Sequence, residues 1–307
     1  SLSTNAVVLS NVIVGYGSSV VTDVGLTNSN GFRVALAATN ITTGATNLTL
    51  GGVGSLTAGS GTTTALTFAA GQGTGTYSNN VSVTYADASS LNGASTNLGS
   101  QTITVTQSVF GHAAGSLSTN AVVLSNVIVG YTGTVATNVG LTNSNGFRVA
   151  LEATNITTGA TNLTLVGVGS LTAGSGTTTA LTFAAGQGTG TYSNNVSVTY
   201  ADASGFLGAS TNLGSQTITV TQNVYDHAAG SLSTSTLSVG DVIVGYSGTL
   251  TNSLVVSNAA GFRVGLNATN DSSGALTLQS ATNLAAGNSL ALGVTPVSYT
   301  HLRAHET

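Results

Sequence analysis

Few side chains in this chain could do chemistry, because charged residues make up only 4% of it. Arginine recurs in a Gly-Phe-Arg-Val segment, as Arg33, Arg148 and Arg263, and aspartate ends a later apolar run, as Asp87 and Asp202. An arginine beside a carboxylate could bind a ligand, or form a surface ion pair that contributes less than about 1 kcal/mol. Strand alternation puts Arg33 outward and Asp87 in phase with the core, which weakens both interpretations.

The remaining candidates favour structural roles. His112 and His227 stand alone, without cysteine or a carboxylate at ligand spacing, so a solvated or linker-packing role is favoured over metal binding. The glycine-rich run Gly71–Gly75 lacks the lysine and the strand–loop–helix context of a phosphate loop, which indicates a turn. No Ser/His/Asp set can be assembled. The sequence therefore predicts a non-enzymatic protein with no catalytic, cofactor-binding or metal-binding residues and no cofactor.

The elements that must position these residues are strands. Short apolar runs alternate with turn residues, and no sustained 3.6-residue period indicates a helix. Strands are expected near residues 5–9, 11–16, 20–27, 33–39, 46–50, 63–69, 77–86 and 101–110. Seven or eight strands in about 110 residues is typical of an immunoglobulin-like sandwich. The predicted fold class is all-β.

The chain is a tandem array with a period of 115 residues, from Ser1 to Ser116 to Ser231. A unit of this length can bury its own core. We therefore expect three immunoglobulin-like β-sandwich domains: residues 1–113, residues 114–228, and residues 229–295. The third domain has no counterparts of strands 77–86 and 101–110, so it is predicted to be truncated.

Residues 296–307 break the composition of the rest of the chain. The segment PVSYTHLRAHET contains the only proline and two of the four histidines. It resembles a translated sequencing-library adapter, and we expect a non-native tail without sheet pairing. His301 and His305 are accordingly not interpreted as metal ligands.

The first two repeats differ at 13 of 115 positions, and the differences predict which side chains face inward. Ala37 corresponds to Glu152, and a lone carboxylate is costly to bury, so this position should face outward. The even positions of that strand then face the core. The inward set expected in the first repeat is Val20, Thr22, Val24, Leu26, Val34, Leu36, Leu48, Leu50, Leu66, Phe68, Val81, Val83, Tyr85, Ile103, Val105 and Val109.

Composition also limits the partners. The net charge is −4 and no basic patch exists, which argues against nucleic acid. No run of about 18 apolar residues exists, so no membrane insertion is expected in this segment. The absence of cysteine excludes a disulfide framework. We expect an internal fragment of a longer protein, with any export signal or anchor outside it.

The second joint carries Val224, Tyr225, Ala228 and Leu232, followed by the segment Gly240–Gly245 and by Ser257–Asn258. This pattern resembles bacterial choice-of-anchor D proteins, relatives of the Hydin-type immunoglobulin-like domains. The first two repeats depart from it, because Ser10 and Ser125 begin the corresponding segments. The resemblance implies an exported, surface-tethered bacterial protein, secreted or at the cell surface, and carries over no catalytic residues.

Three functions remain open. The leading hypothesis is a non-enzymatic structural stalk or spacer of an exported bacterial surface protein, whose repeats are partners of one another. The second is an adhesin or carbohydrate-binding array that gains avidity from repetition and takes an unidentified surface glycan or protein ligand. The third is a β-solenoid autotransporter passenger, which would need a rung period of about 20 residues that the sequence does not show.

One difference between the repeats predicts how they meet. Gly205–Leu207 replaces Ser90–Asn92 and adds large apolar groups in a turn at the end of the domain. We expect Phe206 or Leu207 to pack against the joint near Val109–His112, rather than Phe206 folding back onto its own core edge. Burying both side chains would contribute roughly 2–4 kcal/mol before ordering costs.

Overall fold

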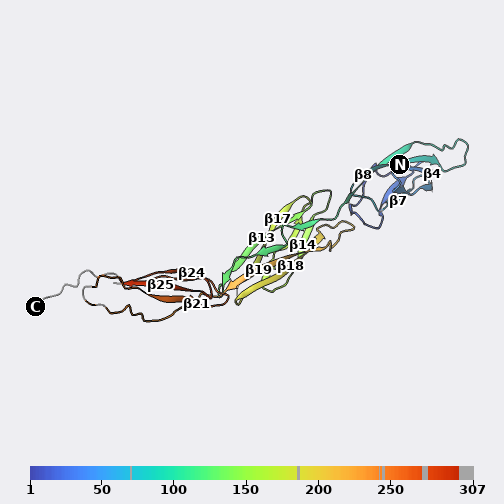
Figure 1. The fold of residues 1–307 in the computed structure, drawn as a ribbon. Helices are drawn as coiled ribbons and strands as arrows, with labels where there is room; N and C mark the ends of the chain where they lie inside the picture. The colour runs from blue at the N-terminus through green and yellow to red at the C-terminus, as the bar shows by residue number, and fades with distance from the viewer. Residues whose placement is uncertain (70, 185–186, 242, 244–245, 272–275, 297–307) are drawn as a thin grey trace.

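The chain folds as a row of three β-sandwich units in a computed structural model (Figure 1). The structure describes residues 1–69, 71–184, 187–241, 243, 246–271 and 276–296. Every described regular element is a strand, as predicted. Each unit closes its own sheets within about one repeat, so the alternative of a continuous β-solenoid is wrong.

The first unit consists of two sheets packed face to face. Its strands are β1 (Ala6–Val8), β2 (Val12–Ile13), β3 (Val20–Thr27), β4 (Leu36–Thr43), β5 (Leu48–Leu50), β6 (Val53–Leu56), β7 (Gly61–Phe68), β8 (Gly75–Asp87) and β9 (Ser100–Phe110). One sheet has the order β1-β9-β8-β4-β6, with β2 also paired to β9, and the other has the order β3-β7-β5. β1 and β2 run parallel to β9, whereas the long β8–β9 pair is antiparallel.

The second unit repeats this topology. Its strands are β10 (Gly115–Leu117), β11 (Ala121–Val123), β12 (Val127–Ile128), β13 (Thr134–Asn143), β14 (Leu151–Thr158), β15 (Leu163–Leu165), β16 (Val168–Leu171), β17 (Gly176–Ala184), β18 (Gly190–Asp202) and β19 (Ser215–Tyr225). The opening segment is divided between the sheets: β10 pairs with β13, and β11 and β12 then pair with β19. This division ties both sheets to the start of the unit.

The third unit has one four-stranded sheet and a two-stranded partner. Its described strands are β20 (Gly230–Leu232), β21 (Asn252–Asn258), β22 (Leu266–Ala268), β23 (Leu276–Leu278), β24 (Ala281–Leu284) and β25 (Ser289–Pro296). The orders are β20-β21-β25-β23 and β22-β24. Its buried core is correspondingly small, with Val256, Ala281 and Leu292 at the centre. Within the described residues this unit has no counterparts of β8 and β9, the strands that the sequence predicts it to lack.

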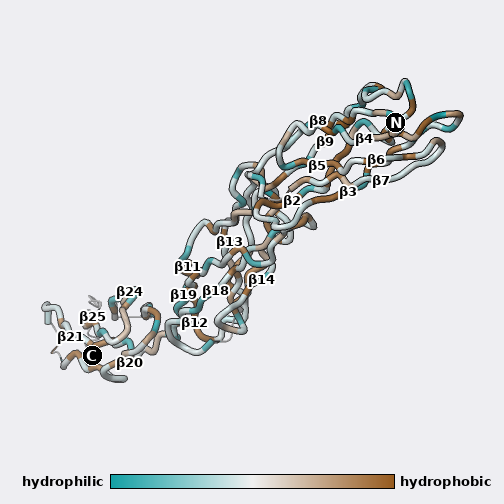
Figure 2. Tube along the Cα trace, turned by 90° about the vertical axis from the view of Figure 1, so that its right-hand side faces the viewer, coloured by the Kyte–Doolittle hydropathy of each residue, from teal (hydrophilic) through white to brown (hydrophobic). Residues whose placement is uncertain are grey.

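The cores lie between the two sheets, and apolar and polar residues alternate along the strands (Figure 2). Of the sixteen inward residues expected in the first unit, all are buried except Thr22, Val34 and Leu36, which are half-buried. Glu152 is half-buried between the buried residues Leu151 and Ala153, in keeping with its outward assignment. In the first unit the same assignment is wrong, because Ala37 is buried. The core also contains a polar residue, Gln107, whose side-chain amide donates a hydrogen bond to the Ser10 carbonyl (3.2 Å).

Two strand predictions need correction. The strand expected at 33–39 begins later, at Leu36, because the Asn28 side chain donates hydrogen bonds to the Val34 and Leu56 carbonyls and holds the preceding residues in a turn. β6 was not expected, since its Gly-Ser sequence has little β propensity. It forms because β4 offers an edge, to which it pairs with a register shift.

The predicted tail begins one residue too early. Pro296 pairs with Leu276 at the end of β25, so it belongs to the sheet of the third unit. β25 lies between β21 and β23, but its pairing with β21 ends at Val294, so Pro296 has a strand on one side only and can pair without the backbone N–H that proline lacks. The rest of the predicted tail, residues 297–307 with His301 and His305, lies outside the described residues.

Candidate functional site

A buried carboxylate and stacked aromatic rings lie at the joint between the first two units. The first hinge, defined as Phe110–Gly115, runs from the last residue of β9 to the first residue of β10. Gly111 forms a parallel bridge with Arg148 of the second unit. Its N–H donates to the Phe147 carbonyl (2.8 Å), and its carbonyl accepts from the Val149 N–H (3.1 Å). The hinge thus extends the second unit before its first strand starts.

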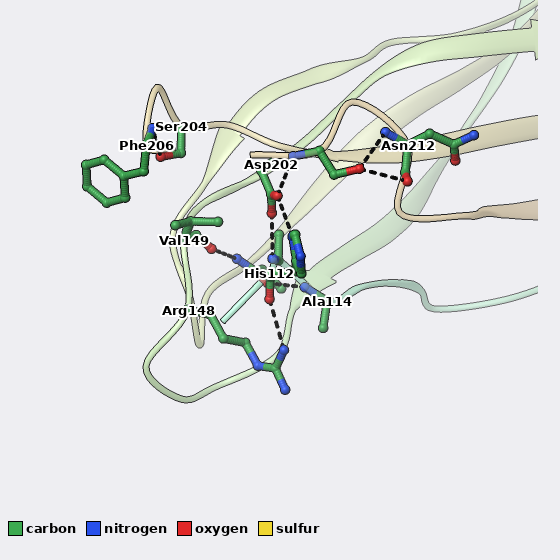
Figure 3. Close-up of polar contacts among 11 residues, drawn as sticks. His112, Ala114, Arg148, Val149, Asp202, Ser204, Phe206 and Asn212 are labelled. Carbon is green, nitrogen blue, oxygen red and sulfur yellow. Dashed lines mark hydrogen bonds and ion pairs between the residues drawn. The ribbon is translucent and has the colours of Figure 1, made fainter. Parts of the chain in front are cut away.

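A buried carboxylate holds the middle of this hinge (Figure 3). Asp202, whose side chain is 0% exposed, accepts hydrogen bonds from the Ala113 N–H (2.8 Å), the Ser210 N–H (2.9 Å) and His112 Nδ1 (2.7 Å). A carboxylate only accepts hydrogen bonds, so Nδ1 carries the proton. Three donors around one buried carboxylate satisfy it in the way that its desolvation requires.

Two further side chains of the second unit bind the hinge backbone. Arg148 Nη1 donates to the His112 carbonyl (2.9 Å), which Figure 3 shows beside the Asp202 contacts. Asn143 accepts from the Ala114 N–H (3.0 Å) and donates its amide to the Val149 and Leu171 carbonyls. The Ala114 carbonyl in turn accepts from the Ser144 N–H (2.9 Å). The described contacts therefore bind the hinge at nearly every residue.

Apolar contacts cover both ends of the hinge. The ring of Phe110 stacks on Phe147 with centroids 4.4 Å apart and planes 5° from parallel. At the other end, a Cβ on Gly115 would lie 2.7 Å from a ring carbon of Tyr200 and 2.9 Å from Leu151, so only glycine fits there. Burial raises the pKa of Tyr200 to about 12.

A turn of the second unit also reaches the first unit. Phe206 packs on Phe110 with ring centroids 5.2 Å apart, and the backbone of Leu207 forms a parallel β-bridge with Val12. The Ile13 N–H donates to the Leu207 carbonyl (2.8 Å), and Ile13 is 0% exposed within the core cluster of the second unit. The predicted packing of this turn against the joint is confirmed. Leu207 contacts the joint mainly through its backbone, since its side chain stays 41% exposed, so the expected gain from burying both side chains is too large.

The joint between the second and third units keeps part of this design. Its hinge, the second hinge, is defined as Tyr225–Gly230. Tyr225 stacks on Phe262 at 4.5 Å, and Arg263 Nη1 donates to the His227 carbonyl (2.9 Å). Asp226, which stands where the first hinge has Gly111, forms an ion pair with Arg263 (3.1 Å). Within the described residues, no carboxylate contacts the His227 ring.

The candidate site residues predicted from the sequence have different outcomes in the structure. Arg33 and Asp87 form no ion pair in the described structure, and Asp87 accepts instead from the Ser95 N–H (2.8 Å). His112 packs in the linker, one of the two roles expected for it. Residues 71–74 of the Gly71–Gly75 run lie between β7 and β8, in keeping with the expected turn, and Gly75 begins β8. Among the described residues no group of three or more His, Asp or Glu side chains is arranged to hold a metal ion.

Sequence reasoning missed the aromatic of the Gly-Phe-Arg-Val segment. The rings of Phe147 and Phe262 stack on the aromatic ring that ends the preceding unit. On sequence alone, only the neighbouring arginine is a candidate site residue. The signal is present in the sequence, since each complete repeat ends in Val-Phe or Val-Tyr and the next contains Gly-Phe-Arg. Pairing the two required knowing that the hinge runs alongside this segment.

No protein-family model and no curated protein matches the chain. Among solved structures it is similar to the human desmocollin-1 ectodomain, with 14% identity and a TM-score of 0.42 over 75% of this chain and 42% of that one. It is also similar to a Porphyromonas gingivalis W83 protein of unknown function (13% identity, TM-score 0.28, 73% and 98% of the two chains). A third similar structure is the titin immunoglobulin tandem A164-A165 (10% identity, TM-score 0.23, 74% and 96%). The chain spans less than half of the desmocollin structure.

The class of the protein follows from its own sheets. Two facing sheets, an opening segment divided between them, and two full units followed by a truncated one define tandem immunoglobulin-like β-sandwich domains. At the first joint of this array, one unit supplies a hinge and the next unit binds it. Among the described residues, no helix is long and apolar enough to cross a membrane.

Proposed function

We propose that the chain is a non-enzymatic stalk or spacer of an exported bacterial surface protein, which holds a distal module away from its anchor. The observation that carries the proposal is the first joint, where backbone bonds, a buried carboxylate and stacked aromatics join consecutive units in a row. A spacer must resist collapse at its joints, and a hinge bound along its length supplies that resistance.

The resemblance to choice-of-anchor D proteins supports the surface role. Tyr225, one of the residues that carry the resemblance, forms the aromatic stack of the second joint. Of the Gly240–Gly245 segment, residues 242, 244 and 245 lie outside the described part of the chain. On this proposal the protein is secreted or at the cell surface, and its main partners are its own neighbouring repeats.

An adhesin or carbohydrate-binding array is the alternative. A glycan platform needs exposed aromatic rings on an accessible face. The exposed aromatic side chains among the described residues are Phe32, Tyr131, Phe147, Tyr246 and Phe262. Phe147 and Phe262 are occupied by joint contacts, so the sheet faces offer little of such a platform.

Small-angle X-ray scattering of the whole chain tests the proposal. A spacer predicts a rod-like distance distribution that keeps its maximum dimension across salt and temperature below unfolding. A compact or broadly averaged distribution would contradict it. Micromolar binding to a soluble glycan, with an unchanged particle shape, would favour the adhesin alternative instead.

A further inference from the structure

The end of the first unit that corresponds to the hinge-binding surface of the second unit is open. In the second unit this surface binds the first hinge through Phe147, Arg148, Val149, Asn143 and Asp202. We call it the receiving end. Ser1 is the counterpart of Ser116, and the hinge that contacts the second unit lies immediately ahead of Ser116.

Apart from Phe206, which packs on Phe110 and corresponds to Leu91, the groups that bind the hinge are repeated in the first unit. The counterparts are Asn28, Ser29, Phe32, Arg33, Val34, Leu36, Tyr85 and Asp87, identical in residue type to the second-unit positions 115 residues later. The turn around Asn28 is also the same, since its amide donates to the Val34 and Leu56 carbonyls as that of Asn143 does to the Val149 and Leu171 carbonyls. The receiving end of the first unit is therefore preformed.

Burial shows what the missing contact would cover. Phe32 is fully exposed at 114%, whereas Phe147 stacks on Phe110 and is 43% exposed. Leu36 is half-buried where Leu151 is 0% exposed, and Asp87 is half-buried where Asp202 is buried. In the second unit these three residues lie against the hinge, which contacts Phe147 through Phe110, Leu151 at Gly115 and Asp202 through His112 and Ala113.

The hydrogen bonds show the same pattern. The Val149 and Ser144 N–H groups donate to the hinge, whereas within the described chain Val34 and Ser29 make no such bonds. Asp202 accepts three hydrogen bonds where Asp87 accepts one, from the Ser95 N–H. The open end thus presents an aromatic face, backbone donors and a carboxylate in the arrangement that binds a hinge.

We propose that this end of the first unit is a binding surface for one kind of partner: a hinge segment of the sequence type Val-Phe-Gly-His-Ala-Ala-Gly, joined directly ahead of Ser1. A second copy of the chain is a poorer occupant, because both of its hinges already contact the units that follow them. The inference concerns the surface alone and does not depend on the stalk function.

The test adds this seven-residue segment in front of Ser1 of the whole chain and follows amide hydrogen exchange by mass spectrometry. Peptides from the two repeats are told apart when they include Ala37 or Glu152. The extension is expected to slow exchange in the Asn28–Ala37 peptide at least tenfold, to the level of the Asn143–Glu152 peptide. The latter peptide serves as the internal control and should not change.

Two control extensions test the chemistry. A scrambled segment of the same composition, and a segment with its phenylalanine and histidine replaced by serine and alanine, should give less than a third of the protection. Asp87→Asn should likewise weaken the effect of the native extension. These controls separate recognition of the hinge from nonspecific shielding by extra residues.

Three results would overturn the proposal. The native extension could leave exchange in the Asn28–Ala37 peptide unchanged, or the scrambled extension could protect it equally. The unextended chain could also show concentration-dependent dimerisation in sedimentation, with protection of Phe32 that rises in parallel. That result would assign the surface to a second copy. A rod-like scattering profile would be unaffected by any of them, so the stalk function stands or fails separately.

Discussion

The two joints of this chain start from nearly the same sequence and end with different contacts. At the first joint, the turn around Leu207 lies against Ile13, which is 0% exposed. At the second joint, the corresponding Ile128 is half-buried and Tyr131 is 47% exposed. An open depression of about 730 Å³ lies there, lined by residues including Ile128 and His227. Within the described residues, the truncated third unit places no turn in it.

Each joint can have two sets of contacts, which different strands of the following unit supply. The aromatic stack and the contact between arginine and the histidine carbonyl need only the first strands of the next unit, and both joints have them. The carboxylate clamp is the set of hydrogen bonds that Asp202, on β18, accepts from the hinge residues His112 and Ala113. The apolar turn, which carries Phe206, connects β18 to β19, the last two strands of the next unit. A complete joint therefore requires a complete following sandwich, which makes the stiffness of the array depend on the integrity of each unit.

The largest effect is expected from the clamp. Asp202→Asn places an amide N–H₂ against a donor and should lower the free energy of unfolding of the second unit by about 2–4 kcal/mol. Asp87→Asn is the matched control, because Asp87 accepts only from the Ser95 N–H and should cost about 1 kcal/mol. Exchange in repeat-specific peptides under urea measures both. Equal losses for the two variants would contradict the clamp.

The second-largest loss of stability is expected from overpacking at the hinge. Gly115→Ala brings a methyl group within 2.7 Å of Tyr200 and should destabilise the second unit by about 1–3 kcal/mol. Gly54→Ala is the control, since nothing lies within 4 Å of a Cβ there. The urea midpoints of the two variants give the comparison. A midpoint for Gly115→Ala that matched the control would mean that the hinge does not press on Tyr200.

The apolar turn offers a swap that the protein itself supplies. Replacing Gly205-Phe206-Leu207 with Ser-Leu-Asn, the sequence at 90–92, should remove about 1–2 kcal/mol of contact at the first joint. The reverse swap in the first unit changes an exposed turn and serves as the control. Exchange at Ile13 should rise only in the first variant. If it does not, the turn contributes little to the joint.

The smallest expected effect is on alkaline stability. Burial raises the pKa of Tyr200 to about 12, above the value of about 10 for an unfolded tyrosine. The stability that neutral Tyr200 contributes is fully present below pH 10 and is lost as the pH rises towards 12. Tyr200→Phe should flatten the fall in the unfolding free energy of the second unit between pH 10 and 11.5. An unchanged slope in urea titrations would assign the fall to other groups.

Much of the fold follows from local pattern. The alternation around Val81, Val83 and Tyr85 places these residues in the core, whereas the phase expected from Glu152 fails at Ala37, where β4 has a register shift. The start of β4 could not be predicted, because a distant hydrogen bond from Asn28 to the Leu56 carbonyl helps hold the turn before it. β6 forms only because a neighbouring edge accepts it. These are contacts between residues far apart in sequence, and no local propensity encodes them.

The sequence predicts where the first two units meet, but not which side chains of the second unit bind the hinge. The substitution at Gly205–Leu207 indicated where the units meet, since two large apolar groups in a turn need cover. Nothing local indicated that Asp202 would bind the hinge 90 residues earlier in the chain through His112. Likewise Tyr200 and Gly115 become neighbours only when the hinge is docked. Partner choice at a joint is a property of two units together.

The first joint should be stiffer than the second, and pulsed electron–electron double resonance can measure this directly. The chain has no cysteine, so spin labels can be placed at the equivalent exposed positions Thr49, Thr164 and Thr277. The Thr49–Thr164 pair spans the first joint, and the Thr164–Thr277 pair spans the second. We expect a narrow distance distribution for the first pair, broadened by the 205–207 swap, and a broader one for the second. Equal widths, or a first-pair width that the swap leaves unchanged, would contradict the account.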